Sequence, residues 1–452
     1  MTMELQNAEC RLQSRACRLV LGLAVLASVS PVYAAAQATA RATTTPVVTL
    51  TEARRAALVV DPVAVEATQR VQAVGWERRA ARIDLIAPRI STNLNYIRFS
   101  DPFFNFGTGS VSPNAASATL EANYVLIGAG KLGQVKSRTA ALESAEANET
   151  VTRFQSTLET DAAYFAVLAS HELARVAADR VKRAEEQLAV SRVRVVAGDA
   201  IASDSLQLLL ELIRARFTLL QQDSAVVASR LFLGSRVGLT GPADAAPIDT
   251  VMPPELPFTE AQAVEELRRR GPDVEAARAD ERSADAALST ARERYIPALT
   301  LGYTYGAYDS ELFPSALKRS QVSLGVVLPI WDGGLREIAV ARSSAERNVA
   351  RARRNELERA SAERIAQAYL GYQTARQGIM LAQVGVAAAT ETYRVQRARY
   401  GEGATIIIEL LEAQEALSES EAGLVRARFA SRLALSQIEA LLGRRVFDAP
   451  GQ

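Results

Sequence analysis

Cysteine and histidine are scarce in this sequence. Of its 452 residues, 2 are cysteine and 1 is histidine. Both cysteines, Cys10 and Cys17, lie before residue 34, so the rest of the chain has no thiol with which to form a disulfide. One histidine, His171, and two later methionines, Met252 and Met380, do not support a relay for soft metal ions. We expect His171 to be structural or exposed, and we expect no bound metal and no cofactor.

Net charge is also almost absent, and no long apolar run follows residue 34. Lys and Arg total 52 against 51 Asp and Glu, and a formal net charge of +1 offers no basic field for nucleic acid. No stretch after residue 34 reaches the roughly 18 consecutive apolar residues of a membrane-spanning helix. Two alternatives follow: the protein is soluble, or it crosses a membrane as β-strands.

The charged residues show no pattern of an active site. Hydrophobic residues make up 48% and charged residues 23% of the chain, which is typical of a folded protein. The acids fall on long helical patterns. No second cluster converges on them, as a nucleophile with its base or a pair of catalytic carboxylates requires. We therefore expect that the protein is not an enzyme.

The first 34 residues have the pattern of an export signal. Three arginines precede the apolar stretch Leu19–Leu26, and Val32–Ala34 is a small-x-small cleavage site. A polar segment rich in Ala and Thr follows directly, which argues against the alternative of a buried N-terminal helix. The sequence predicts that residues 1–34 are a signal peptide and that the protein is exported.

The chain repeats its own pattern after about 205 residues. Ala184–Gly198 and Ala389–Gly403 share Val, Arg and Gly residues in register. Before each lies a short helical pattern, opened by Thr51 in one case and by Thr259 in the other. The alternative is chance similarity between alanine-rich amphipathic helices, but the landmarks also share their order. Duplicated units must bury their apolar faces against each other, so we expect one body rather than two independent domains.

Four segments of the chain alternate between apolar and polar residues. This period of two predicts strands with one apolar face, and their length of about ten residues matches a tilted membrane strand. Loops at Ser100–Ala116 and Asp309–Arg319 join them into two hairpins, in which Phe103, Phe104 and Phe313 are candidates for an aromatic girdle. The expected strands are Ile90–Phe99, Ala118–Leu126, Leu299–Tyr308 and Ser320–Leu328.

Long helical patterns fill most of the remaining sequence. Ser137–Ala197 contains neither proline nor glycine, and such a helix would be roughly 90 Å long. Alanine at many seam positions predicts closely packed helices, as a closed tube of coiled coils requires. The other expected long helices are Ala202–Val237, Glu337–Tyr400 and Thr405–Leu442.

Four strands are too few to close a membrane barrel. The smallest closed barrels have about eight strands, and an open edge in lipid leaves unpaired backbone groups that cost several kcal/mol each. Two, three or four copies of the chain would supply about 8, 12 or 16 strands. A water-filled lumen favours three or four copies, and strand geometry alone does not choose between them.

Two motifs resemble the TolC family of outer-membrane efflux proteins. Leu328–Gly334, which reads LPIWDGG, is similar to the family's strand-to-helix signature. Arg399–Gly403, which reads RYGEG, precedes Glu409–Gln414, which reads ELLEAQ, and together they are similar to the family's hairpin motif. The first repeat is more diverged. The resemblance extends over essentially the whole chain after residue 34.

The resemblance implies a homotrimer in the outer membrane of a Gram-negative bacterium. Each chain would be mainly α with a small β part. Three copies would share a 12-stranded barrel, and duplicated helical hairpins would continue it as a coiled-coil tunnel across the periplasm. The implied partners are a periplasmic adaptor, an inner-membrane transporter and outer-membrane lipid, with no nucleic acid.

The implied function is passive export of cargo in a tripartite efflux or type I secretion system. Drugs, metal ions and polypeptides all remain open as cargo. The alternative is a periplasmic adaptor or a structural coiled-coil protein, although an adaptor would normally show one helical hairpin between β-rich domains.

The resemblance also assigns candidate functional residues. Glu409 and Glu412 would line a closed periplasmic aperture, and their spacing of three places them on one helix face. The alternative is a solvated acidic face. Near the hairpin tips, glycines would reverse the chain in a left-handed conformation and nearby residues would contact the adaptor. The expected adaptor contacts are Arg194, Gly198, Asp199, Arg399, Gly401 and Gly403.

These observations divide the chain into six parts. They are a signal peptide (1–34), a flexible segment (35–49), the first repeat (50–242), a linker (243–257), the second repeat (258–443) and a C-terminal tail (444–452).

Overall fold

The computed structural model describes residues 45–105, 109–128, 130–198, 200–248, 252–311 and 317–447. The chain divides into a unit of residues 1–44 and a unit of residues 45–452, and the described secondary structure belongs to the second. The expected signal peptide with Cys10 and Cys17 lies outside the described residues, as do Asp199, Phe313 and the end of the tail after residue 447.

The described fold is mainly α-helical with a small β part, as expected from the sequence. Two short helices, two strands, one very long helix and one long helix follow one another, and the same order then occurs again. The elements are β1 (Val47–Val48), α2 (Leu50–Val60), α3 (Pro62–Ile86), β2 (Arg89–Asn105), β3 (Ser110–Ile127), α4 (Lys131–Ala197), α5 (Ala202–Arg236), β4 (Asp244–Ala245), α6 (Glu260–Arg270), α7 (Pro272–Glu293), β5 (Ala298–Asp309), β6 (Leu317–Val327), α8 (Leu335–Gly401) and α9 (Ile407–Leu442).

The short helices show where the two repeats correspond. The sequence suggested Thr51 as the start of the first short helix, but this was wrong: Thr49 caps α2 through a reciprocal capping box with Glu52. Thr259 and Gln262 form the same box at the start of α6. Each short helix is followed by a helix with proline in its first turn, where the missing N–H costs no hydrogen bond.

The two longest helices, α4 and α8, contain 67 residues each. At 1.5 Å per residue each is about 100 Å long, so the expected rods are confirmed. The helix α4 begins six residues before the expected Ser137 and includes Gly133. The Gly133 N–H donates to Glu293 Oε2 of α7 at 2.8 Å, and a Cβ at this position would lie 2.5 Å from the same oxygen. This hydrogen bond joins the first turn of α4 to the last residue of α7.

Across the described ranges, no helix combines the length and the apolar composition needed to cross a membrane.

Four strands form one antiparallel sheet in the order β2-β3-β5-β6. The inner strands β3 and β5 join the two repeats, with Glu121 paired to Thr304 near the middle of the ladder. Within the described residues, β2 and β6 each pair on one side only, so the sheet has two open edges. Large apolar residues on one face of the edge strands, such as Leu94 and Leu324, are about 70% exposed. The sheet therefore has unpaired backbone groups at both edges and an apolar face that no other described element covers.

The first strand pair is longer than the sequence indicated. We expected a loop at Ser100–Ala116, but this was wrong: Phe103–Asn105 pairs with Ser110–Ser112 beyond a register shift. Pro102 and Pro113 lie at this irregularity, where the missing N–H of proline removes no ladder hydrogen bond. The ladder resumes after the two prolines, which were the reason for expecting a loop.

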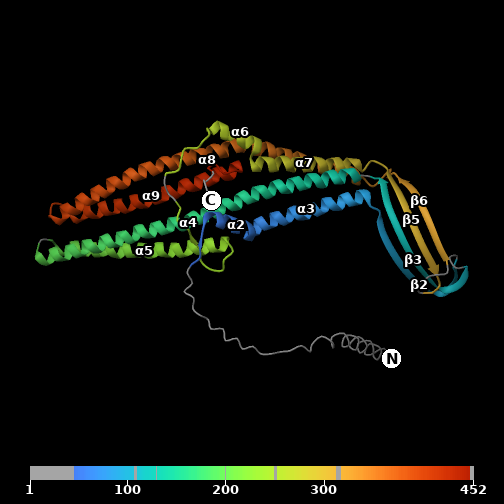
Figure 1. Ribbon diagram of the computed structural model, residues 1–452, viewed down its shortest axis with the longest axis horizontal. Helices are drawn as coiled ribbons and strands as arrows, with labels where there is room; N and C mark the ends of the chain where they lie inside the picture. The colour runs from blue at the N-terminus through green and yellow to red at the C-terminus, as the bar shows by residue number, and fades with distance from the viewer. Residues whose placement is uncertain are drawn as a thin grey trace, which may run out of the picture. The chain divides into compact units, whose positions relative to one another are not determined.

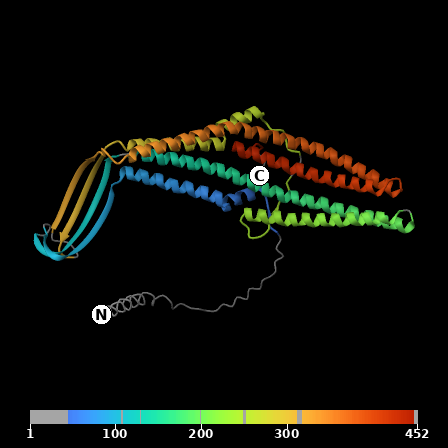
Figure 2. The same cartoon turned by 180° about the vertical axis from the view of Figure 1, so that it is seen from behind.

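The helices lie side by side, with the sheet at one end and the two hairpin turns at the other (Figures 1 and 2). The linker between the repeats crosses this bundle. Its strand β4 pairs in parallel with β1, and the Tyr164 hydroxyl of α4 donates to Ala246 O at 2.7 Å. The Tyr372 hydroxyl of α8 donates to Pro254 O, also at 2.7 Å. Both long helices thus hold the linker through a tyrosine.

A buried ion pair within the first repeat is bonded to the second repeat near the middle of the bundle. Arg54 of α2 and Asp161 of α4 form two hydrogen bonds of 2.5 Å, and their side chains are 9% and 2% exposed. Ser436 of α9 donates to the same carboxylate at 2.7 Å. Removing one partner would leave a buried charge unpaired, which typically costs about 3–5 kcal/mol. The pair thus fixes α2, α4 and α9 relative to one another.

Candidate functional site at the hairpin tips

Both hairpins reverse through a glycine in the left-handed region. Gly198 has φ 84° and ends α4, and its N–H donates to Arg194 O and Val195 O. In the second hairpin the left-handed residue is Gly403, with φ 75°, whereas Gly401 is the last residue of α8. A side chain would strain either turn, because the left-handed region is unfavourable for residues with a Cβ. The local role expected for Gly198 and Gly403 is confirmed.

The two matching arginines act differently. Arg194 is half-buried and crosses to the other hairpin, where Nη1 donates to Tyr400 O and the guanidinium lies 5.1 Å from the centre of the Tyr400 ring. Arg399 is exposed and donates to Ala404 O of its own turn at 3.4 Å. Arg194 therefore ties the hairpins together, while Arg399 is presented at the surface.

Tyr400 joins the tip of the second hairpin to the first. Its ring is buried, and its hydroxyl donates to Asp204 Oδ2 of α5 at 3.4 Å. One heptad earlier, the Tyr393 hydroxyl accepts from Gln187 Nε2 of α4 at 2.8 Å. Sequence reasoning missed both tyrosine contacts. The available signal was the spacing of seven residues, which places Tyr393 and Tyr400 on one face of α8.

A cluster of apolar side chains surrounds these polar contacts and packs the two hairpins against each other. Its buried members come from all four long helices, which lie side by side toward the tips (Figure 2). They are Ala184, Leu188, Leu208, Leu212, Ala215, Tyr393, Tyr400, Ile407, Leu410, Ala413 and Leu417.

Beside this cluster, a groove of about 430 Å³ separates α4 from α8 at the tips. Its walls combine the apolar Val190 with the charged Glu186, Arg394, Arg397 and Glu402. Arg397 also forms an ion pair of 3.1 Å with Glu186 across the two helices. The tips therefore present a surface of mixed charge with a shallow apolar recess.

The expected aperture acids lie on the first turns of α9. Glu409 and Glu412 are both exposed on one face, and Thr405 Oγ1 donates to Glu409 Oε2 at 2.6 Å. Two further exposed acids that sequence reasoning did not assign, Glu415 and Glu419, extend this face along α9. The corresponding residue of the first repeat, Asp204, bonds to Tyr400 instead. The acidic face is therefore carried by the second repeat.

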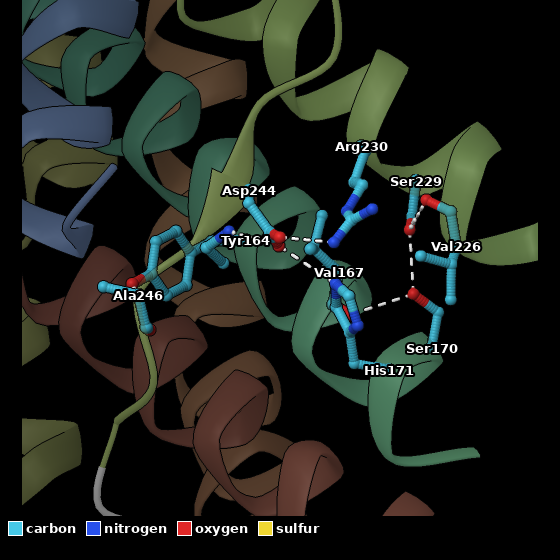
Figure 3. Close-up of polar contacts among 10 residues, drawn as sticks. Tyr164, Val167, Ser170, His171, Val226, Ser229, Arg230, Asp244 and Ala246 are labelled. Carbon is cyan, nitrogen blue, oxygen red and sulfur yellow. Dashed lines mark hydrogen bonds and ion pairs between the residues drawn. The ribbon is translucent and has the colours of Figure 1, made fainter. Parts of the chain in front are cut away.

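The only histidine lies in a separate polar cluster near the middle of the bundle. His171 Nε2 is 2.9 Å from Asp244 Oδ1, and Arg230 donates to the other carboxylate oxygen, so Asp244 lies between them (Figure 3). Ser170 and Ser229 are bonded at 2.8 Å beside this cluster and join α4 to α5. No group of three potential metal ligands occurs among the described residues. His171 here contributes to holding β4 against α4.

The charges around Asp244 predict a pH dependence. Burial alone would raise the pKa of Asp244, but the hydrogen bond from Arg230 and the charges of His171 and Arg230 hold that pKa below its usual value. Its ionised form is therefore stabilised by folding. This contribution is complete above the ordinary pKa of about 4 and is lost as the pH falls through the lowered value.

Replacing Asp244 with asparagine should lower the unfolding temperature at pH 7, and this difference should shrink as the pH falls through the lowered pKa of Asp244. At low pH the wild-type carboxyl is itself protonated and has lost the same charge. The measurement is the thermal midpoint of both proteins by circular dichroism from pH 7 to the lowest pH at which both still fold. A difference that stays constant over this range would contradict the assignment.

Comparison with known proteins agrees with this geometry. Residues 263–444 match the family model described as outer membrane efflux protein, and this range contains both motifs of the second repeat. The second repeat of the chain matches the outer membrane efflux protein family. The resemblance found in the sequence and the outer-membrane localisation are thereby confirmed.

Solved structures share the fold of this chain. The outer membrane protein VceC of Vibrio cholerae is 18% identical, with a TM-score of 0.73 over 88% of this chain and 97% of its own. The CmeC outer membrane channel of Campylobacter jejuni is 14% identical, with a TM-score of 0.76 over 87% and 85%. The MtrE outer membrane channel of Neisseria gonorrhoeae is 18% identical, with a TM-score of 0.74 over 88% and 89%. A comparison with curated protein sequences gives no match.

Proposed function

We propose that three copies of this chain form an outer-membrane channel whose helical part extends into the periplasm. The observation that carries the proposal is the open sheet, because β2 and β6 cannot leave their backbone groups unpaired in lipid. The two edge strands run in opposite directions. The β2 edge of one copy therefore fits the β6 edge of the next as an antiparallel pair. The count of three follows the resemblance to the TolC family.

The helical part supports the same assembly. One face of α5 carries large apolar residues at alternating intervals of four and three, interrupted only at Ser224, which is the spacing of a coiled-coil seam. These side chains are 47–65% exposed, so no helix of the same chain covers them. A helix of a neighbouring copy would bury the stripe. The α5 stripe consists of Leu206, Leu210, Ile213, Phe217, Leu220, Val227 and Leu231.

The acidic face of α9 suggests how ions would pass the tips. Three copies would bring three pairs of Glu409 and Glu412 around one axis. Such a ring favours cations at a constriction and excludes anions. The contacts of Arg194 and Tyr400 hold the two hairpins together next to this ring. We propose that the constriction opens when these contacts break.

The exposed tips would receive the partners of the channel. The groove beside Arg397, with the turns at Gly198, Gly401 and Gly403, offers an adaptor both apolar and charged contacts. We propose the same surface for Asp199 and Arg399. An inner-membrane pump would then deliver cargo through the adaptor, and the channel would conduct it passively and without catalysis. A soluble periplasmic adaptor is the competing function.

The trimer is tested through the α5 stripe. The purified wild-type protein in detergent should have three times the mass of one processed chain. Replacing Phe217 and Leu220 together with glutamate should abolish that species, because charges in a buried seam are strongly unfavourable. Ala225→Glu is the control, since Ala225 is exposed on α5 outside the stripe. Native mass spectrometry gives the masses.

A wild-type protein that is monomeric in plain buffer after osmotic shock would instead favour the adaptor. Intact trimers of the double variant would show that the stripe is not a subunit seam.

The acid pair is tested in planar bilayers. Replacing Glu409 and Glu412 with alanine should raise single-channel conductance and weaken cation preference, because up to six carboxylates leave the constriction. Glu66→Ala is the control, because Glu66 is an exposed acid on α3, far from the tips. Conductance and reversal potential would be recorded in a salt gradient. A conductance and a reversal potential equal to those of the wild type would contradict the proposal that Glu409 and Glu412 line the aperture.

A further inference from the structure

The polar face of the sheet carries opposite charges in two neighbouring rows. In one row, Glu121 of β3 is paired with Ser91 and Thr304, and Thr304 is paired with Gln321. In the next row, Arg319 of β6 is paired with Gly306, which is followed across the sheet by Thr119 and Asn93. The directly paired neighbours of both charges are therefore neutral. Each charge stands without an opposite charge beside it in its row.

Both charged residues lie on the face opposite the membrane-type apolar residues. Alternation places Glu121 opposite Leu120 and Ala122, and Arg319 opposite Ser320 and Val322. Arg319 is exposed and Glu121 is partly exposed. In a shared barrel the apolar face contacts lipid, so the face with Glu121 and Arg319 lines the lumen.

Two glycines on the same face leave room for neighbouring side chains. A Cβ on Gly306 would lie 2.6 Å from the Tyr308 hydroxyl, which shows that the tyrosine side chain folds over this position. A Cβ on Gly302 would lie 2.7 Å from Ser323 Oγ. The Tyr308 side chain therefore covers Gly306 on the lumen side of β5, beside Arg319.

The order of the rows along the sheet is defined by the helices. The strand β2 begins at Arg89, directly after α3, so rows near Arg89 lie at the helical end (Figure 1). The row of Glu121 lies nearer this end than the row of Arg319, and Ser323 lies one row nearer still. A solute that enters from the other end meets Arg319 first, then Glu121, then Ser323.

We propose that Glu121 and Arg319 form two charged belts in the barrel lumen that sort small ions by charge. The inference rests on the proposed trimer, which would give three carboxylates in one belt and three guanidinium groups in the next. Charges in a narrow pore with low-dielectric walls focus the electric field on passing ions. Glu121 then raises the local concentration of cations at the inner belt, and Arg319 raises that of anions at the outer belt.

A cysteine reporter placed beyond both belts tests the proposal. The background is Cys10→Ser with Cys17→Ser, which removes the natural thiols, and Ser323→Cys then adds one in the lumen. Assembled channels in planar bilayers are exposed from the outer side to a cationic or an anionic methanethiosulfonate. The readout is the ratio of the two modification rates. Reagents that enter on this side reach the reporter without passing the helical tips.

Glu121→Gln should lower the cation-to-anion rate ratio by about fivefold, and Arg319→Gln should raise it by a similar factor. Glu66→Gln on α3 is the matched control and should leave the ratio unchanged. A heat-resistant trimer on a gel shows that each variant is assembled. The opposite directions of the two changes distinguish a charge effect from a general change in pore width.

The outcomes separate this inference from the proposed channel. If the reporter reacts but neither variant changes the ratio, the proposal of charged belts is wrong. The assignment of the polar face to the lumen is then still supported. If Ser323→Cys is protected and Val322→Cys on the apolar face reacts instead, the assignment of the lumen fails and the belts fail with it.

Discussion

The structure depends on one requirement, the pairing of every backbone N–H and C=O group that meets lipid. The chain supplies four strands with two unpaired edges, which is too few for a closed barrel. The missing pairs are backbone groups, so no change of side chain within one copy satisfies them. This requirement connects the sheet to the duplicated helices. In the proposed trimer, each subunit would contribute one third of the barrel and one third of the helical part that continues it.

The helical part is consistent with this role. Two rods of about 100 Å run from the sheet to the hairpin tips. The repeats are fixed to each other by the hydrogen bond of Ser436 to the buried Arg54–Asp161 pair and by the apolar cluster at the tips. One face of α5 stays apolar and exposed. The chain is therefore well packed where its own repeats meet. It leaves apolar side chains uncovered where a neighbouring copy would lie. At the tips, the polar contacts of Arg194 and Tyr400 add to the packing of this apolar cluster.

Much of this fold could be predicted from the sequence because the patterns are periodic and bounded by proline. At the helical end of the sheet, the four strand boundaries lie within one residue of those expected. The outer part of β2 and β3 was missed because Pro102 and Pro113 suggested a loop, whereas a register shift accommodates them. Contacts such as Arg194 with Tyr400 and His171 with Asp244 join segments far apart in the chain, and their pairing depends on helix packing that no local pattern encodes.

Amide hydrogen exchange on the edge strands would test the central claim most directly. In the assembled protein in detergent, the outward amides of β2 and β6 should exchange as slowly as the paired amides of β3 and β5, because a neighbouring copy bonds them. Amides on β2 and β6 that exchange much faster than those of the inner strands would show that the edges are open. That result would contradict the shared barrel.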